Sequence, residues 1–195
     1  MIPGVDTMRD AVLVASLRGG DPVAFGRVHA TFGPRLYNFL ARMTGNKERA
    51  EDLYQETWIK LALHASRLDP DTDLGGWLYT VARNLARSER RSEKARPATV
   101  ADARPEHALD HRASPYDWAS ANQTEALVER ALADLPGPMR EVLLLVVIDG
   151  LELDQVAQIV DLKPEALRQR LSRARAKLAE RLDELTRQTR ANVKE

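Results

Sequence analysis

The sequence has no cysteine and no apolar run long enough to cross a membrane, and we expect no signal peptide. The lack of cysteine excludes disulfide bonds and thiolate-ligated metals, and it fits a reducing compartment. The longest apolar run, Val142 to Ile148, is far shorter than the roughly 18 residues that a membrane span needs. The first twenty residues lack the basic start of a secretory signal. We therefore expect a cytoplasmic protein that does not insert into a membrane.

The sequence also lacks a net charge, since its 29 basic residues balance 29 acidic ones. Hydrophobic residues make up 44% and charged residues 30% of the chain, which is typical of a soluble globular protein. The balance does not hold locally, because residues 163–178, KPEALRQRLSRARAKL, include six basic residues and one acid. The charges are therefore divided between surfaces of opposite sign, which favour different partners.

Apolar residues recur at helical spacing along most of the chain, and no segment alternates as a strand would. The pattern predicts a first helix that begins after the cap residue Asp21, is bent or broken at Gly33-Pro34 and ends at Gly45. Further helices are expected over 47–68, 76–91, 125–135 and 139–149, and the segment 151–185 is expected to hold two helices with a tight joint at 161–163. The fold class is therefore all-α.

Residues 93–122 interrupt this pattern, because they are rich in proline, small and charged residues and have no sustained apolar period. A structureless stretch of this length is uncommon inside a compact domain. We therefore expect two small helical domains, 1–92 and 123–195, joined by a flexible linker. Tyr116 and Trp118 either dock onto another surface or form a short turn. His107 and His111 have the spacing of two metal ligands on a helix, but no further ligand is evident, and we expect no metal.

The C-terminal domain ends in a predicted helix-turn-helix. A short helix capped by Asp154 leads to a tight joint at Asp161, a residue type that tolerates the left-handed conformation. Pro164 suits the first turn of the second helix. The apolar stripe of that helix consists of Leu167, Leu171, Ala174 and Leu178.

The opposite face of this second helix is basic and polar, with Arg168, Gln169, Ser172, Arg173 and Arg175. Arginine binds guanine edges and phosphates, and glutamine pairs with adenine edges. The face therefore indicates binding to duplex DNA. The alternative is a solvated basic helix without a ligand.

A second basic stretch lies in the predicted helix 76–91, where Tyr79, Arg83, Arg87 and Arg90 align at spacings of four and three. They are expected to lie opposite an apolar side formed by Trp77, Leu78, Val81 and Leu85. Aromatic and arginine side chains on one face suit unpaired bases and phosphates. An ordinary solvent-exposed face is the alternative.

An acidic and polar stripe runs along the predicted helix 47–68 and consists of Asp52, Gln55, Glu56 and Ile59. It would repel DNA and could dock on a basic protein surface. The alternative is that its acids help the helix to start.

Three segments in this order, AEDLYQETW, WLYTVARNLARSERR and LPGPMREVLLLVVIDGLELDQVAQIV, resemble bacterial sigma factors of the extracytoplasmic-function group in the sigma-70 family. The resemblance covers about 21–185 apart from the linker. It implies that Asp52, Gln55 and Glu56 bind core RNA polymerase. It also implies that Arg83, Asn84 and Arg87, with the loop from Leu68 to Gly76, contact and melt the promoter −10 element.

The resemblance further implies that the helix-turn-helix reads the −35 element, with Arg168, Gln169, Arg170, Ser172 and Arg173 toward DNA. The sequence departs from the family pattern at two places. Asp161 stands where the family usually has Gly, and residues 166–169, Ala-Leu-Arg-Gln, replace Thr-Val-x-Ser. We therefore expect a slightly altered joint and a distinct −35 sequence.

These observations favour an alternative sigma factor, active in transcription initiation and stress response. The partners that the resemblance implies are core RNA polymerase, promoter DNA and an anti-sigma factor. We expect a monomer when free, no cofactor and no enzymatic activity, because no catalytic constellation or phosphate-binding glycine loop is evident. The alternatives are a helix-turn-helix regulator that acts without polymerase, for which no dimer helix is evident, and a sigma mimic, which would not need the basic helix.

Overall fold

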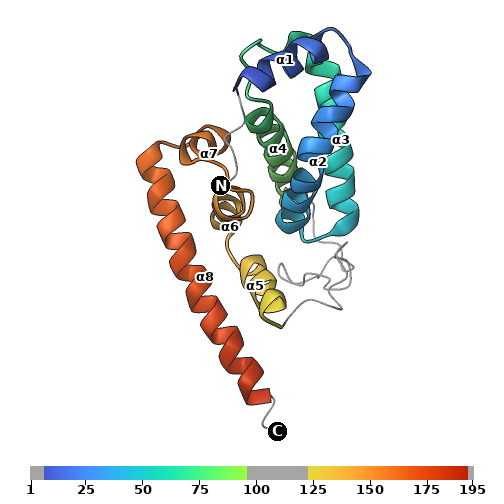
Figure 1. The fold of residues 1–195 in the computed structure, drawn as a ribbon. Coiled ribbons are helices and arrows are strands. Elements are labelled where there is room, and N and C mark those ends of the chain that lie inside the picture. Colours follow the sequence, from blue (N-terminus) through green and yellow to red (C-terminus); the bar gives the residue numbers. More distant parts are fainter. Residues whose placement is uncertain (1–6, 96–122, 193–195) are drawn as a thin grey trace.

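The computed structural model describes residues 7–95 and 123–192, and all regular elements in these two ranges are helical (Figure 1). The expected linker, with Tyr116, Trp118, His107 and His111, lies outside the described residues apart from the last turn of one helix. The N-terminal unit contains α1 (Thr7–Arg18), α2 (Pro22–Thr44), α3 (Lys47–His64), a 3-10 turn η1 (Ala65–Arg67) and α4 (Leu74–Ala95). No helix in the described part is long and apolar enough to cross a membrane.

Helix α2 begins and ends where the cap residues predict. The Asp21 carboxylate accepts a hydrogen bond of 2.8 Å from the backbone N–H of Val23, and Gly45 ends the helix in the left-handed conformation with φ 66°. Of the two expected alternatives at Gly33-Pro34, a bend or a break, the break is absent, since α2 runs through both residues. Gly33 instead provides space, since a Cβ there would lie 2.7 Å from the Tyr54 hydroxyl of α3.

The buried face of helix α4 differs from the apolar side that the sequence predicts. Leu78 is fully buried, but Trp77, Val81 and Leu85 are only half-buried, and the helix also buries a second face. This second face consists of Tyr79, Ala82, Arg83 and Ala86. The reason is that α4 packs on α2 and α3 on one side and on α7 of the C-terminal unit on the other. The helix also continues to Ala95, three residues past the expected domain boundary.

The C-terminal unit contains α5 (Gln123–Ala133), α6 (Gly137–Leu143), a π turn (Leu144–Ile148), α7 (Leu153–Val160) and α8 (Pro164–Asn192). The single helix expected over 139–149 is thus an α-helix that widens into a π turn. Helix α7 begins after Glu152 rather than at Asp154. The Gln155 side chain accepts a hydrogen bond of 3.3 Å from the Glu152 backbone N–H.

Asp161 forms the joint of the helix-turn-helix in the left-handed conformation, with φ 53°. It is the only residue other than glycine with a positive φ among the described residues. The expected stripe of α8 faces the core, since Leu167, Leu171 and Ala174 are buried and Leu178 packs against them.

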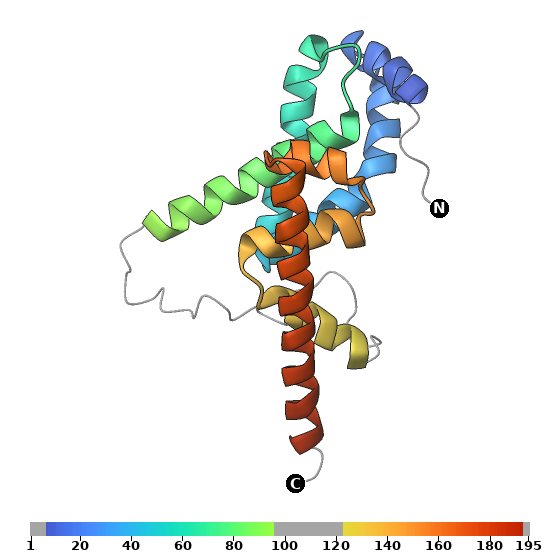
Figure 2. The ribbon, with the colours of Figure 1, turned by 90° about the vertical axis from the view of Figure 1, so that its left-hand side faces the viewer.

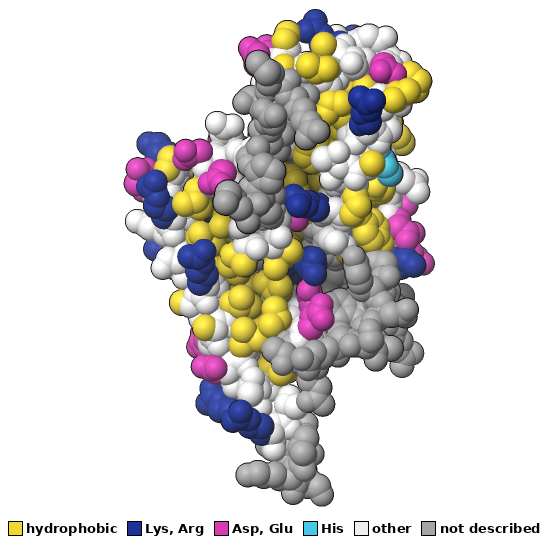
Figure 3. All heavy atoms as spheres, in the orientation of Figure 1, with side chains coloured by type: hydrophobic (Ala, Val, Ile, Leu, Met, Phe, Trp, Pro, Cys, Tyr) yellow, Lys and Arg dark blue, Asp and Glu magenta, His cyan; other side chains and the backbone are white. Residues whose placement is uncertain are grey.

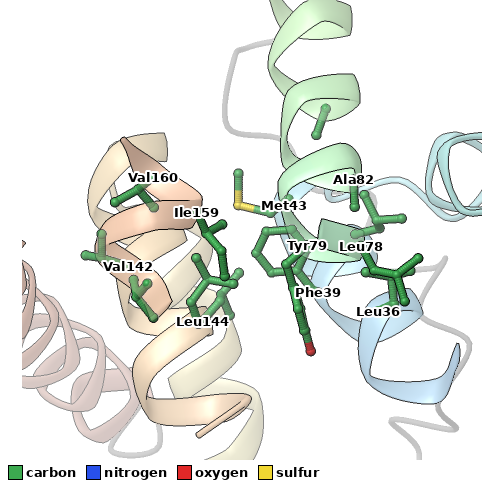
Figure 4. Close-up of a cluster of buried hydrophobic side chains, with 14 of the residues drawn as sticks. Leu36, Phe39, Met43, Leu78, Tyr79, Ala82, Val142, Leu144, Ile159 and Val160 are labelled. Atoms are coloured by element: carbon green, nitrogen blue, oxygen red, sulfur yellow. The ribbon is translucent and has the colours of Figure 1, made fainter. Parts of the chain in front are cut away.

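The two units pack against each other through a continuous apolar core (Figure 4). Leu144 and Ile159 of the C-terminal unit face Met43 of α2 and Tyr79 of α4 across this contact. Figures 1 and 2 show α7 beside α4, while the far end of α4 and most of α8 extend away from the shared body. The structure is therefore a closed arrangement in which the two units pack against each other.

Candidate nucleic-acid interface

The basic face of α8 is open to solvent. Arg168, Gln169, Ser172, Arg173 and Arg175 are all exposed, as the helical spacing predicts. Their only ion pair among the described residues is a long one of 4.0 Å between Arg168 and Glu165. These side chains are therefore available to phosphates and to base edges in a major groove.

The acidic stripe of α3 is also exposed. Asp52, Gln55 and Glu56 face solvent, and Glu56 forms an i,i+4 ion pair of 3.5 Å with Lys60. Ile59 in the same stripe is 57% exposed. All four side chains of the stripe are therefore accessible to a protein partner.

The predicted nucleic-acid face of α4 is divided by the contact between the units. Asn84 and Arg87 are exposed, but Tyr79 is 2% and Arg83 5% exposed. The expectation that Tyr79 and Arg83 lie on a solvent-facing side is wrong for this closed form, because α7 and the π turn cover them. Neither side chain can contact DNA in this arrangement.

The guanidinium of Arg83 is held by acceptors from the C-terminal unit. Its Nε donates to Glu141 Oε1 at 2.6 Å, and its Nη2 donates to the backbone carbonyl of Val160 at 3.0 Å. Glu141 is 3% exposed, so the ion pair is enclosed. The Val160 carbonyl belongs to the last turn of α7, where backbone acceptors lack helical partners.

Three further polar contacts join the units. Arg42 of α2 donates hydrogen bonds of 2.8–3.2 Å to both carboxylate oxygens of Glu129 in α5. Arg140 of α6 donates to the Arg42 backbone carbonyl at 3.2 Å, and burial lowers the pKa of Arg140 to about 10. Gln155 of α7 donates at 3.0 Å to Asp73, which also caps the start of α4. The loop from Leu68 to Gly76 is thus attached to the helix-turn-helix.

A polar cleft of about 560 Å³ remains between the units. Asn84 and Arg87 line it from α4, and Gln158, Asp161 and Arg170 line it from the helix-turn-helix. Arg170 is half-buried there, unlike the other predicted DNA contacts of α8. The cleft therefore brings residues predicted to contact the −10 and −35 elements to opposite walls of one space.

A carboxylate and a phenol also meet where the units touch. Asp149, at the end of the π turn, is 5% exposed and lies near Tyr79 of α4. Asp149 Oδ2 and the Tyr79 hydroxyl are both buried without a hydrogen-bond partner among the described residues. Burial raises the pKa of Asp149 to about 7, and burial together with Asp149 raises the pKa of Tyr79.

The sequence does not identify the acceptors and donors that join the units, namely Asp73, Glu129, Glu141 and Gln155. One available signal is the position of Glu141 beside the apolar run 142–148. A charged residue that borders such a run on a buried helix needs a partner. That partner, Arg83, is 58 residues away and across the linker.

Apolar side chains also reach the surface of the C-terminal unit. On the face shown in Figure 3 they form a band bordered by separate basic and acidic groups. Val147 is 54% and Ile148 44% exposed. Surface of this kind is available to a protein partner.

Comparisons with known proteins match both units. Residues 29–96 match the model of sigma-70 region 2, and residues 125–178 match that of sigma-70 region 4. The chain is 30% identical to the ECF RNA polymerase sigma factor EcfG of Rhodopseudomonas palustris strain TIE-1, over 91% of this chain and 86% of the relative. It is 33% identical to the RNA polymerase sigma factor CarQ of Myxococcus xanthus, over 86% and 94%.

Two solved structures share the fold. CnrH, in complex with the cytosolic domain of CnrY, has a TM-score of 0.67 and 25% identity, with coverage of 90% of this chain and 97% of CnrH. The sigma factor RpoE of Bartonella quintana, in complex with the anti-sigma factor NepR, has a TM-score of 0.64 and 24% identity, with coverage of 82% and 96%.

Proposed function

This chain is an extracytoplasmic-function sigma factor of the sigma-70 family, and we propose that its closed form must open before it can recognise a promoter. Residues 1–92 form the region 2 domain in this proposal, and residues 123–195 form the region 4 domain. Asp52, Gln55 and Glu56 bind core RNA polymerase. The −35 element is bound by α8 through Arg168, Gln169, Arg170, Ser172, Arg173 and Arg175.

The −10 element is assigned to α4 through Tyr79, Arg83, Asn84 and Arg87. The burial of Tyr79 and Arg83 is the observation that carries the proposal of a closed, inactive form. Melting requires bases to leave the stack and bind protein groups, and side chains covered by another domain cannot receive them. Asn84 and Arg87 are accessible, so the closed form retains only part of this surface.

Separation of the units would not disrupt either helical framework. Each unit retains its own apolar core, because Leu36, Leu40 and Leu61 are buried on the region 2 side and Leu167 and Leu171 on the region 4 side. The polar groups released on opening, Arg83, Glu141 and Arg42 among them, would be solvated. An interface with this many polar contacts suits domains that separate in function.

An anti-sigma factor would act on the equilibrium between the closed and the open arrangement of the two units. CnrH, at 25% identity over 97% of its length, is seen with the cytosolic domain of CnrY. We expect this chain to bind a protein partner of this kind, and a partner that binds only the closed form stabilises it by mass action. The chain works as a cytoplasmic, non-enzymatic initiation factor that is monomeric when free.

Core polymerase binding is tested by reversing the charge of the α3 stripe, with Asp52→Lys and Glu56→Lys together. Both side chains are exposed, so helix content measured by circular dichroism should be unchanged. Binding to purified bacterial core RNA polymerase should fall at least about a hundredfold, since like-charge contacts across an interface cost several kcal/mol.

The matched control reverses two exposed acids of α8 in the C-terminal unit, Glu180→Lys and Asp183→Lys, and should bind core polymerase normally. Wild-type affinity of the α3 variant would contradict the docking assignment. A wild-type chain that binds promoter DNA but never core polymerase would instead favour a helix-turn-helix regulator that acts alone.

A further inference from the structure

Asp149 is a buried acid whose burial depends on the closed arrangement. It ends the π turn of the C-terminal unit and precedes Gly150, which has φ 67°. Tyr79, which approaches it, belongs to α4 of the other unit and is itself 2% exposed. Separation of the units would remove this cover and return the Asp149 carboxylate to water.

The groups around Asp149 compensate its charge only weakly. From α4 it faces Tyr79, and from α2 the nearby cations are Arg42 and Arg35. Arg42 already donates hydrogen bonds to both carboxylate oxygens of Glu129. Arg35 is exposed to solvent, which screens its charge. No hydrogen bond reaches Oδ2 of Asp149 from the described residues.

A buried carboxylate without a full partner favours its neutral form, because closure removes the water that solvates the charge. Burial therefore raises the pKa of Asp149 to about 7 in the closed form, and Tyr79, Arg42 and Arg35 only partly oppose this shift. In an open form the side chain would be solvated, and its pKa would return to the ordinary aspartate value of about 3.9.

We propose that one proton binds to Asp149 when the two units close, an inference that rests on the closed form proposed above. Low pH then favours the closed form, and high pH favours the open form. The Tyr79 hydroxyl can pair with Asp149 in either protonation state, but only the protonated acid leaves no charge buried between the units. Deprotonation leaves a buried charge that is relieved when the units part. Opening of the units therefore releases the proton from Asp149 and at the same time exposes Tyr79 and Arg83, which we assign to the −10 element.

The sign of the pH dependence follows from linkage. The closed form has the higher pKa at Asp149, so it binds the proton more tightly, and the closed-to-open ratio rises as pH falls. The closed-to-open ratio depends on pH between the Asp149 pKa of the open form and that of the closed form. In this range each pH unit changes the ratio about tenfold. Between pH 7.5 and 6.5 the ratio should change about threefold, since the upper pKa is near 7.

The test measures the distance between the units by energy transfer in the full chain from pH 5.5 to 8.5. Because the chain has no cysteine, dyes can be attached to introduced cysteines at two exposed positions, Ser66→Cys and Ala176→Cys. The closed fraction should fall as pH rises. In D149N, a neutral isostere of the protonated acid, the units should stay closed with no pH dependence over this range.

The matched control is D154N, which removes an exposed acid of α7 and should retain the wild-type pH profile. If D149N does not fold, a carbon-13 NMR titration of the Asp149 carboxyl in the wild-type chain decides the question. A midpoint near 4 in the closed form, or a D149N profile identical to wild type, would overturn the proposal. Absence of a closed form at every pH would refute the closed conformation itself, whereas a closed form insensitive to pH would refute only the proton coupling.

Discussion

Arg83 can bind two different groups of acceptors, and it can bind only one group at a time. In the closed form its guanidinium is directed at Glu141 and the Val160 carbonyl, at 2.6 and 3.0 Å. In the open form the same donors would be free for phosphate oxygens, for which the planar guanidinium is well suited. Glu141 therefore takes the place that we propose for promoter DNA. In the proposed mechanism, competition between this carboxylate and DNA for Arg83 couples domain closure to loss of −10 binding.

The first prediction at this scale concerns Glu141→Gln. The amide keeps the shape and one acceptor but removes the charge opposite Arg83. A hydrogen bond between charged groups contributes about 2 kcal/mol to stability. If all of this is lost, the ratio of closed to open molecules should fall by up to roughly thirtyfold. Energy transfer between the units should fall, and binding to a single-stranded −10 oligonucleotide should increase.

Glu165→Gln is the matched control, because Glu165 is an exposed acid that lies 4.0 Å from Arg168. This variant should behave as wild type in both measurements. Unchanged compactness and unchanged oligonucleotide binding in Glu141→Gln would show that the buried ion pair does not hold the units together.

At the scale of single elements, the helices and the basic face of α8 could be predicted because they depend on local spacing. Asp21, Gly45 and Asp161 act through their own backbone and near neighbours, and each lies where the sequence indicates. The sequence alone does not decide where α7 starts, because Glu152 and Asp154 are both acids that suit a helix start. In the structure the helix begins after Glu152.

Helix α4 shows why the rest could not be predicted. Its own spacing indicates one apolar side, yet Arg83 is buried against Glu141 of the other unit, and Tyr79 is buried between Phe39 of its own unit and Asp149 of the other. Such contacts depend on how two domains meet across a linker, and helical periodicity carries no information on that. The chemistry of Arg83 could be recognised from its neighbours, but its partner in the closed form could not.

The second prediction concerns the basic face of α8 and the variant Arg168→Ala/Arg173→Ala. Both side chains are exposed, so the fold should be unaffected. Duplex −35 DNA should bind more weakly, and the slope of log affinity against log salt should become shallower by about 0.9 for each phosphate that the variant no longer neutralises. Fluorescence anisotropy at several salt concentrations measures both quantities.

The control for this variant removes two exposed arginines near the far end of the same helix, Arg187→Ala and Arg190→Ala. It has the same net charge as the test variant and should retain most of the −35 affinity. Equal salt slopes for the two variants would show that general charge, rather than the face at 168–175, accounts for binding.

At the scale of the whole molecule, the three proposed binding surfaces differ in how accessible they are. The α3 stripe and the basic face of α8 are exposed in the closed form, whereas part of the α4 surface is covered. Core polymerase can therefore dock before the units separate. The neutral total charge agrees with this division, because the acidic stripe proposed to bind protein and the basic faces proposed to bind DNA lie on one chain.

The most direct test of the closed form is the distance between the two units before and after core RNA polymerase is added. Energy transfer between dyes at Ser66→Cys and Ala176→Cys should be high in the free chain and should fall when core polymerase binds. In the Asp52→Lys/Glu56→Lys variant it should stay high. Low transfer in the free chain, or unchanged transfer in a chain that has bound core polymerase, would contradict the claim that the −10 surface is covered until the molecule opens.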